Sequence, residues 1–448
     1  MNQPTATVGP AGHDTLTART GGALRGAVTL PGDKSISHRA IMLGALAEGE
    51  TTVAHLLEGE DLLRTVAAFR AMGVRIEREP DGLYRIQGVG LDGLAEPEEV
   101  LDMGNSGTAM RLLAGVLASQ PFFAILTGDA SLRQRPMGRI ITPLSRMGAR
   151  ILSRSQGRAP LVIQGSELIP LDYQSPVASA QIKSAILLAA LNTAGGSSVV
   201  EPQLSRDHTE RMLAAFGAEV IRDGLRVTVE GWPTLTGQRL QVPGDISSAA
   251  FPLVAALLVP DSEVVLQGVG VNPTRVGLLE LLSAMGGEIE WLNPRQQGGE
   301  PVADLRVRHA PLKGITVPPE LIPRAIDEFP IFFVAAALAE GESLLAGAAE
   351  LRVKESDRIH AMAVGLQALG AQITEQEDGV RIVGRPGGLA GGVSVDSFTD
   401  HRVAMSLLVA GLCCRQPVTV RRCANIQTSF PGFRGLMTDL GASVGADG

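Results

Sequence analysis

The sequence predicts an α/β protein of two domains, built from six copies of one unit of about seventy residues. Three observations support this prediction: two markers that recur with the same spacing, and a motif that is duplicated at an offset of 212 residues. The chain of 448 residues also exceeds the size at which one hydrophobic core keeps growing, and 45% of its residues are hydrophobic. The composition is therefore sufficient for two large cores.

The first marker is an apolar helix of small residues that ends in a leucine. It recurs at intervals of 66 to 81 residues. A recurrence of this kind indicates one supersecondary unit that is repeated along the chain. The six leucines are Leu46, Leu117, Leu191, Leu257, Leu338 and Leu412.

The second marker is a helix followed by a glycine and a short strand-like segment, at intervals of 69 to 84 residues. Glycine favours this place because it adopts the left-handed conformation that ends many helices. The two markers keep the same phase, so each unit should hold a strand, a helix, a strand, a second helix and a further strand. The six glycines are Gly73, Gly148, Gly217, Gly286, Gly370 and Gly441.

The duplicated motif divides the chain into two halves of three units. Residues 31–35, Pro-Gly-Asp-Lys-Ser, recur as residues 243–247, Pro-Gly-Asp-Ile-Ser, and both copies precede an apolar helix. We expect hinge crossovers near Pro31 and Pro243, with a cleft between the domains. The first domain should comprise residues 31–242, and the second residues 21–30 with 243–448. Residues 1–20 are polar, lack the apolar segment of a signal peptide, and are expected to be a flexible tail.

Composition excludes several classes of function. The net charge of -8 argues against general nucleic-acid binding, and the apolar segments are too short or too interrupted to span a membrane. Three cysteines without zinc-type spacing fit a reducing compartment, and the adjacent acids Asp327 and Glu328 lack a third partner for a cation. We therefore expect a cytoplasmic monomer that acts on small molecules without a metal ion or cofactor.

Cations and hydroxyls gather where the first helix of a unit begins. Residues 34–39 read Lys-Ser-Ile-Ser-His-Arg, and residues 104–111 read Gly-Asn-Ser-Gly-Thr-Ala-Met-Arg. A helix N-terminus offers free N–H groups and a partial positive charge, so such segments suit a phosphate or carboxylate. Each cluster alone is equally compatible with solvated surface, but their shared position in the repeat favours one concave cationic site. Further clusters are residues 133–139, 205–208, 352–358 and 400–402.

Five motifs in order along the chain resemble the enolpyruvyl transferases, and closely the 5-enolpyruvylshikimate-3-phosphate (EPSP) synthases of the second, mostly bacterial subgroup. The resemblance implies an inside-out α/β barrel in two domains, with three βαβαββ units in each. It implies transfer of the enolpyruvyl group of phosphoenolpyruvate to the 5-hydroxyl of shikimate 3-phosphate, with release of phosphate, in the shikimate pathway to chorismate and the aromatic amino acids. The motifs are residues 31–39, 104–111, 135–137, 352–358 and 400–402.

The resemblance also implies which residues hold the two substrates. Each substrate carries a phosphate and a carboxylate, which Arg forks and Lys point charges suit. Asp327 is implied as the base at the 5-hydroxyl, Glu355 as the proton donor to the methylene carbon, and Lys34 as a further catalytic group. The residues expected to face phosphoenolpyruvate are Lys34, Gly107, Arg135, Gln181, Arg358 and Arg402. Those expected to hold shikimate 3-phosphate are Lys34, Ser35, Arg39, Ser179, Gln181, Ser205, Arg206, Asp327 and Lys354.

Two features of the resemblance concern the phosphoenolpyruvate side. Some family members carry a lysine before a Thr-Phe-Pro near the C-terminus, whereas this chain has Gln427 before Thr-Ser-Phe-Pro, so that phosphate contact is unassigned. Gly107 should leave space that a methyl group would fill. The resemblance also implies that the protein is a target of glyphosate, whose charges are like those of phosphoenolpyruvate.

Three other functions are alternatives, and each is less favoured by the sequence. A UDP-N-acetylglucosamine enolpyruvyl transferase would have Asn-Ala after the early lysine, where this chain has Ser35-Ile36. An RNA-end cyclase would need a basic RNA-binding face, which the net negative charge does not favour. A non-catalytic anion-binding protein would gain nothing from Asp327 and Glu355 among the cations.

Overall fold

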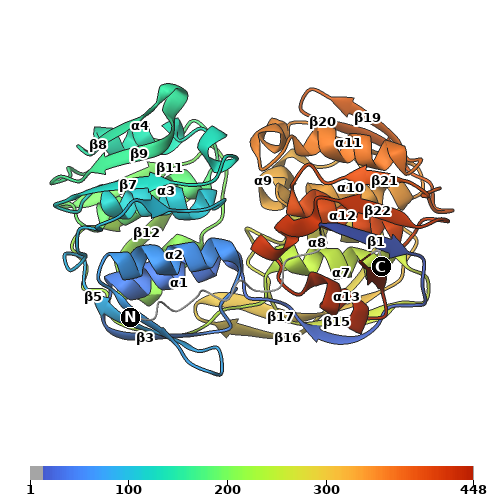
Figure 1. Ribbon diagram of the computed structural model, residues 1–448, viewed down its shortest axis with the longest axis horizontal. Coiled ribbons are helices and arrows are strands. Elements are labelled where there is room, and N and C mark those ends of the chain that lie inside the picture. Colours follow the sequence, from blue (N-terminus) through green and yellow to red (C-terminus); the bar gives the residue numbers. More distant parts are fainter. Residues whose placement is uncertain (1–13, 447–448) are drawn as a thin grey trace, which may run out of the picture.

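The protein consists of two lobes that lie side by side in the computed structural model, which describes residues 14–446 (Figure 1). Each lobe has its own hydrophobic core. One core is formed by residues between Ile36 and Val242. The other is formed by residues between Leu16 and Leu30 together with residues between Ile246 and Val444. Within residues 14–446, six small sheets are present and no helix is long and apolar enough to cross a membrane. The predicted α/β class is confirmed.

The second unit shows the repeated architecture most simply. Its sheet has the order β6-β7-β9-β8, in which β6 and β7 are parallel and the other pairs are antiparallel. Helices α3 and α4 connect the strands, which gives the order βαβαββ. The elements are β6 (Leu101–Asp102), α3 (Gly107–Leu117), β7 (Phe123–Thr127), α4 (Gly138–Arg146), β8 (Arg150–Arg154) and β9 (Arg158–Gln164).

The other units of the first lobe repeat this order. They contain α1 (Lys34–Leu46), β3 (Glu48–Ala54), α2 (Glu60–Ala71), β4 (Arg75–Arg78), β5 (Tyr84–Val89), β10 (Asp172–Gln174), α5 (Ala180–Ala190), β11 (Gly196–Val200), α6 (His208–Ala215), β12 (Val220–Asp223), β13 (Arg226–Glu230) and β14 (Arg239–Gln241).

The second lobe has three units of the same kind. They contain β1 (Thr15–Arg19), β2 (Arg25–Thr29), α7 (Ile246–Leu258), β15 (Glu263–Gly270), α8 (Gly277–Ala284), β16 (Glu288–Gln297), β17 (Glu300–Arg308), α9 (Ile322–Ala325), α10 (Phe329–Leu338), β18 (Glu342–Leu345), α11 (Arg358–Ala368), β19 (Gln372–Gln376), β20 (Gly379–Val383), β21 (Ser394–Asp396), α12 (His401–Gly411), β22 (Val418–Arg421), α13 (Phe433–Asp439) and β23 (Ser443–Gly445). In the fifth unit the first strand is reduced to a parallel bridge between Thr316 and Leu344.

Both sequence markers fall where the repeat predicts. The first helix of every unit ends within one residue of its marker leucine. All six marker glycines have φ between +87° and +114°, a region that side chains with a Cβ rarely adopt. The six-unit organisation is therefore confirmed.

Two strands are exchanged between the lobes. β2 precedes α1 along the chain but pairs in parallel with β15 of the second lobe. β14 precedes α7 but pairs in parallel with β3 of the first lobe. Because each of these strands lies in one lobe while the helix after it lies in the other, the chain crosses between the lobes twice, once after β2 and once after β14 (Figure 1).

The prediction of a flexible tail over residues 1–20 is wrong for residues 15–19. These residues form β1, which lies between β22 and β23 and supplies the last strand of the sixth unit. Leu16 and Ala18 are buried. The alternation in Thr15–Arg19 is short, and its pairing partners lie at the other end of the chain. Residues 1–13 lie outside the described residues.

Candidate active site

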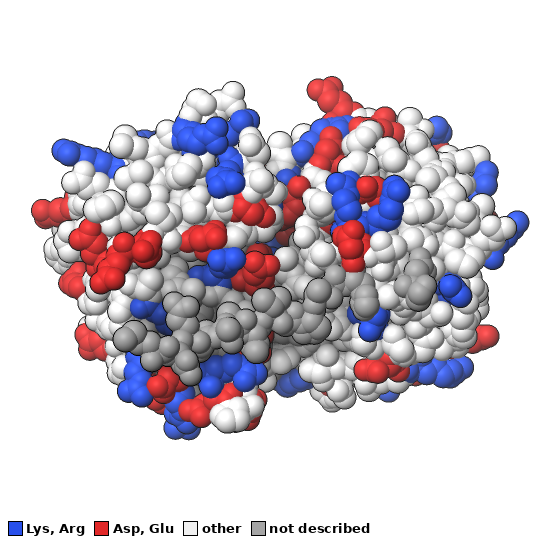
Figure 2. All heavy atoms as spheres, in the orientation of Figure 1, with Lys and Arg blue, Asp and Glu red and all other residues white. Residues whose placement is uncertain are grey.

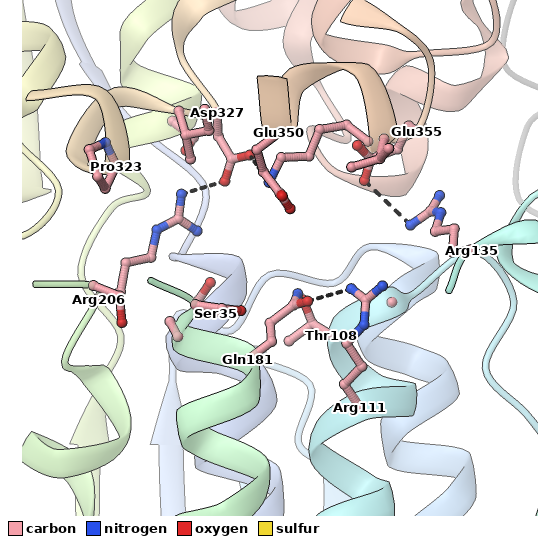
Figure 3. A pocket seen from close by; sticks show the side chains of 18 of the residues that line it. Ser35, Thr108, Arg111, Arg135, Gln181, Arg206, Pro323, Asp327, Glu350 and Glu355 are labelled. Carbon is pink, nitrogen blue, oxygen red and sulfur yellow. Dashed lines mark hydrogen bonds and ion pairs between the residues drawn. The ribbon is translucent and has the colours of Figure 1, made fainter. Parts of the chain in front are cut away.

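A cavity of about 490 Å³ lies between the two lobes. Residues at or next to the start of the first helix of every unit line it: α1, α3 and α5 from one lobe, and α7, α10 and α12 from the other. Figure 3 shows Ser35, Thr108 and Gln181 at the ends of the first-lobe helices, facing Asp327, Glu350 and Glu355 across the cavity. Six helix N-termini favour bound anions. The predicted convergence of the helix starts is thus observed.

The cavity wall is rich in positive charge. Among the described residues it contains nine Lys or Arg side chains and five Asp or Glu side chains. The outer surface, in contrast, mixes both signs on the face shown in Figure 2. The cavity can therefore hold several anionic groups although the net charge of the chain is -8.

Helix caps fix the cations at the cavity wall. The Asp33 carboxylate accepts a hydrogen bond from Ile36 N at 2.9 Å, and the Asp400 carboxylate accepts one from Arg402 N at 2.9 Å. Ser106 Oγ likewise accepts from Ala109 N at 3.1 Å. Because a cap sets the residue at which a helix begins, these contacts place the following residues, among them Lys34, in the first turn at the cavity.

Asp327 lies among cations from both lobes. Its carboxylate pairs with Arg206 of the first lobe, and lies 3.3 Å from Arg358 Nη1 and 3.6 Å from Lys354 Nζ (Figure 3). Burial alone raises the pKa of Asp327, but the cations, led by Arg206 and Lys354, outweigh burial and hold it well below its usual range. Asp327 is therefore ionised at neutral pH.

Glu355 is also held by cations from both lobes. Its carboxylate lies 2.5 Å from Arg358 Nη2 and 3.5 Å from Arg135 Nη1 of the first lobe. Burial raises the pKa of Glu355, but Arg358 and Arg135 outweigh burial and hold it well below its usual range. In this structure Glu355 is thus ionised and has no proton to give, although the sequence predicts that it is a proton donor.

All but one of the predicted site residues line the cavity; each of them falls in the described part of the chain. The exception is Arg39, whose side chain is buried beneath the cavity wall. It donates to Ser35 O at 2.9 Å, to Thr209 Oγ1 at 2.6 Å and to Ser184 Oγ at 2.7 Å. Two of these bonds connect α1 with α6 and α5, so Arg39 lies behind the cavity wall, and its contact with shikimate 3-phosphate stays a prediction.

Several residues that line the cavity were not assigned to either substrate from the sequence. Asp61 pairs with Lys34, and Arg111 donates to Gln181 Oε1. Arg111 stands one helical turn after Gly107, a spacing that could have indicated it. Asp61 has no such signal, since it comes from the next helix. Arg139 belongs to the predicted cluster of residues 133–139 but had no assigned substrate, and Glu350 and Arg275 are further charged residues of the wall.

A fully buried ion triad supports the first-lobe wall. Lys183 Nζ lies 2.8 Å from a carboxylate oxygen of Glu201 and 2.8 Å from one of Glu210. The Glu201 carboxylate also accepts from Ser179 N at 2.9 Å and from Ser205 Oγ at 2.8 Å. The triad thus orients two serines that the sequence predicts as ligands of shikimate 3-phosphate.

His38 makes the fold sensitive to acid. Its buried ring pairs with Thr65 Oγ1 at 2.8 Å, and burial followed by the nearby Lys34 lowers its pKa from 6.5 to about 3. Below pH 6.5 the His38 ring of the unfolded chain binds a proton, whereas the same ring in the folded chain stays neutral. The free energy of unfolding therefore decreases as the pH falls toward 3. At pH 5 the loss is about 2 kcal/mol relative to pH 7.

We expect His38→Asn to flatten the pH dependence of stability, because Asn can keep the bond to Thr65 without titrating. Urea unfolding of the variant and the wild type between pH 7 and pH 5 measures this difference. His360→Asn makes the same substitution at an exposed position and so controls for the effect of the substitution itself. If the free energy of unfolding depends on pH equally in His38→Asn and in the wild type, the His38 ring is not held neutral in the folded protein.

Comparison with known proteins shows what this chain is similar to. The profile of the family described as EPSP synthase (3-phosphoshikimate 1-carboxyvinyltransferase) matches residues 18–437. The chain belongs to this family. A 3-phosphoshikimate 1-carboxyvinyltransferase of Magnetococcus marinus is 66% identical over 432 residues, which cover 96% of this chain and 97% of that protein. The enzyme of the same name from Halorhodospira halophila is 57% identical and covers 96% of each chain.

Solved structures of the EPSP synthase family share the fold. An EPSP synthase from Acinetobacter baumannii superposes with a TM-score of 0.87 at 49% identity, over 96% of this chain and 99% of that one. The enolpyruvyl transferase NikO from Streptomyces tendae superposes with a TM-score of 0.77 at 17% identity, over 96% of this chain and 98% of that one. The second likeness concerns the fold alone. As a member of the EPSP synthase family, this chain is a transferase.

Proposed function

We infer that this protein transfers the enolpyruvyl group of phosphoenolpyruvate to the 5-hydroxyl of shikimate 3-phosphate and releases phosphate. The observation that carries this inference is the cationic cavity between the lobes, in a chain of the EPSP synthase family. Its positive side chains exceed its acids by four, so the cavity can offset much of the charge of two phosphates and two carboxylates. The two acids beside those cations, Asp327 and Glu355, distinguish this site from a passive anion receptor.

We propose the following roles for the residues of the wall. Asp327 accepts the proton of the 5-hydroxyl, and Lys34 stabilises charge at the departing phosphate. Phosphoenolpyruvate is held by Lys34, Gly107, Arg135, Gln181, Arg358 and Arg402. Shikimate 3-phosphate is held by Lys34, Ser35, Ser179, Gln181, Ser205, Arg206, Asp327 and Lys354.

The decisive experiment is a coupled phosphate-release assay with phosphoenolpyruvate, in which shikimate 3-phosphate and UDP-N-acetylglucosamine are offered in turn. We expect release with shikimate 3-phosphate. Release with the sugar nucleotide alone would overturn the inference, and binding of both substrates without any release would indicate an anion-binding protein.

We propose that Glu355 gains its proton only when substrates are bound. The anionic groups of phosphoenolpyruvate would draw Arg358 and Arg135 away from the Glu355 carboxylate, which removes the cations that lower its pKa. The protonated acid can then give its proton to the methylene carbon. Glu355→Gln should lower kcat by about 10²- to 10⁴-fold, the usual contribution of a general acid, and an unchanged kcat would exclude this role.

We propose that the lobes correspond to the predicted domains, residues 31–242 and residues 21–30 with 243–448, the second extended by β1, and that they move about the crossings near Pro31 and Pro243. Ion pairs such as Arg139 with Glu350, at 2.9 Å, already join the lobes at the cavity. Small-angle X-ray scattering should show a smaller radius of gyration when both substrates are bound. An unchanged radius would contradict a hinge at these crossings.

We also propose that the protein works as a monomer in the cytoplasm, on small molecules alone. The support is its composition and the location of the entire cavity within one chain. Sedimentation equilibrium tests the monomer, and a dimer that persists at nanomolar concentration would exclude it.

Gly107 gives a prediction about inhibition. A Cβ at this position would lie 3.2 Å from Arg111 Nη1 and 3.3 Å from Arg135 Nη1, so both guanidinium groups would have to move. We expect Gly107→Ala to raise the inhibition constant of glyphosate about tenfold or more, at least 1.4 kcal/mol, while the KM for phosphoenolpyruvate rises less. Gly138→Ala is the matched control, because a Cβ there meets no atom within 4 Å. Equal losses for inhibitor and substrate would refute the prediction.

A further inference from the structure

The two Pro-Gly-Asp segments of the duplicated motif lie side by side where the chain crosses between the lobes. Gly32 and Gly244 form an antiparallel bridge. Asp33 N donates to Pro243 O at 2.8 Å, and Asp245 N donates to Pro31 O at 2.9 Å. The two crossings thus form one structural unit, so a change in the conformation of either segment should affect both lobes.

The aspartates of both segments face one guanidinium group. Arg275 Nη1 lies 3.2 Å from Asp33 Oδ2, and Arg275 Nη2 lies 3.6 Å from Asp245 Oδ1. Both aspartates also cap a helix, α1 and α7 respectively. The Arg275 side chain is only 3% exposed. One buried cation therefore holds the starts of two helices that belong to different lobes.

Arg275 also reaches the second-lobe half of the site. Its Nη2 donates to Ser247 Oγ at 2.7 Å and lies 3.8 Å from Glu328 Oε1. The same Glu328 oxygen lies 3.3 Å from Arg402 Nη1, which donates to Asp327 O at 3.0 Å. A path of polar contacts thus extends from the buried Arg275 through the buried Glu328 to Arg402 and the backbone of Asp327.

The loop that carries Arg275 is itself anchored across the lobes. Asn272 Nδ2 donates to Asp207 Oδ1 of the first lobe at 2.7 Å and to Glu300 Oε2 of the second lobe at 2.8 Å. Burial alone would lower the pKa of Arg275, but Asp33, Glu328 and Asp245 outweigh burial and raise it above its usual value. The guanidinium therefore stays charged, and its planar fork presents donors in fixed directions to several partners, a geometry that lysine does not reproduce.

We propose that Arg275 is a positioning residue of the reaction: at the double crossing it fixes Lys34 of the first lobe relative to Asp327 and Arg402 of the second. Lys34 follows Asp33 directly, and Asp327 precedes Glu328 directly. The contacts of Arg275 with Asp33 and with Glu328 are therefore each one residue away from a group that is proposed to touch substrate. This inference rests on the proposed function.

The test is the kinetics of Arg275→Lys with phosphoenolpyruvate and shikimate 3-phosphate. Lysine keeps the charge but not the fork, so we expect kcat to fall about tenfold or more, with the KM of each substrate within about threefold, because misplacement affects the reacting geometry more than binding. Arg308→Lys, an exposed second-lobe arginine, is the matched control and should leave both constants unchanged. A normal kcat for Arg275→Lys in an active wild type overturns the inference, whereas an inactive wild type overturns the proposed function instead.

A second variant keeps the test informative if Arg275→Lys does not fold. Ser247→Ala removes one acceptor of the guanidinium and leaves every charge in place, so kcat should fall about threefold, again without a matching rise in KM. Scattering with both substrates adds a readout independent of turnover: the decrease in radius of gyration should be smaller in Ser247→Ala than in the wild type. Normal kcat and normal compaction in Ser247→Ala would contradict the role of Arg275.

Discussion

Asp327→Asn should lower kcat by about 10²- to 10⁴-fold, the usual contribution of a general base, while both substrates still bind. Asparagine keeps the shape of the side chain but accepts no proton from the 5-hydroxyl. It also frees Arg206 and Lys354, which pair with the Asp327 carboxylate in the structure, so that they can hold substrate anions without competition. Phosphate release measures kcat, and calorimetric titration with shikimate 3-phosphate measures binding.

The matched control for Asp327→Asn is a surface acid of the same lobe. Glu342 pairs with Arg381 on exposed strands, and Glu342→Gln should leave kcat and binding unchanged because exposed pairs contribute little. If Asp327→Asn retains more than about a tenth of the wild-type kcat, another group must take the proton. If it loses turnover and binding together, Asp327 serves to arrange the cavity and is not its base.

The repeated fold could be predicted because it depends on local chemistry. A helix that ends before a reversal of the chain needs a left-handed residue, and glycine adopts that conformation without a steric cost. The six marker glycines therefore indicated the ends of six helices, independently of the other residues in each unit. The anion site could be predicted for a similar reason, since caps and cations at helix starts, such as Asp33 and Lys34, occupy adjacent positions in the sequence.

The remaining features depend on contacts between distant segments. The Thr17 and Thr419 hydroxyls of β1 and β22 are 2.8 Å apart although 402 residues separate them, so no local pattern marked residues 15–19 as a strand. The exchange of β2 and β14 between the lobes agrees with the predicted crossovers near Pro31 and Pro243, because the duplicated motif marked where each half begins.

The charge states of the site also required the structure. Motifs indicated that Glu355 belongs to the site, but its ionisation depends on how close Arg358, and then Arg135 of the other lobe, lie to its carboxylate. Arg39 belongs to the most informative motif of the chain, yet its three hydrogen bonds are all made within the first lobe and its side chain lies behind the cavity wall. The sequence thus predicts which residues belong to the site better than it predicts what each side chain contacts or whether it is protonated.

Lys183→Met should destabilise the protein by about 3–5 kcal/mol, because it leaves two buried carboxylates without their cation. Burial alone lowers the pKa of Lys183, but Glu210 and Glu201 raise it above its usual value, which shows that the ammonium is held by both acids. The side chains of all three residues are at most 3% exposed, so water cannot replace the lost charge. Urea unfolding at pH 7 measures the change in free energy.

Two further variants separate charge from packing in this triad. Lys313→Met, at an exposed lysine, should change stability by less than about 0.5 kcal/mol. Adding Glu210→Gln to Lys183→Met removes one uncompensated charge and should recover part of the loss, whereas a loss that came only from altered packing would persist. Because Glu201 orients Ser179 and Ser205, Lys183→Met should also raise the KM for shikimate 3-phosphate more than the KM for phosphoenolpyruvate. Equal changes in the two KM values would show that the triad does not orient these two serines for shikimate 3-phosphate.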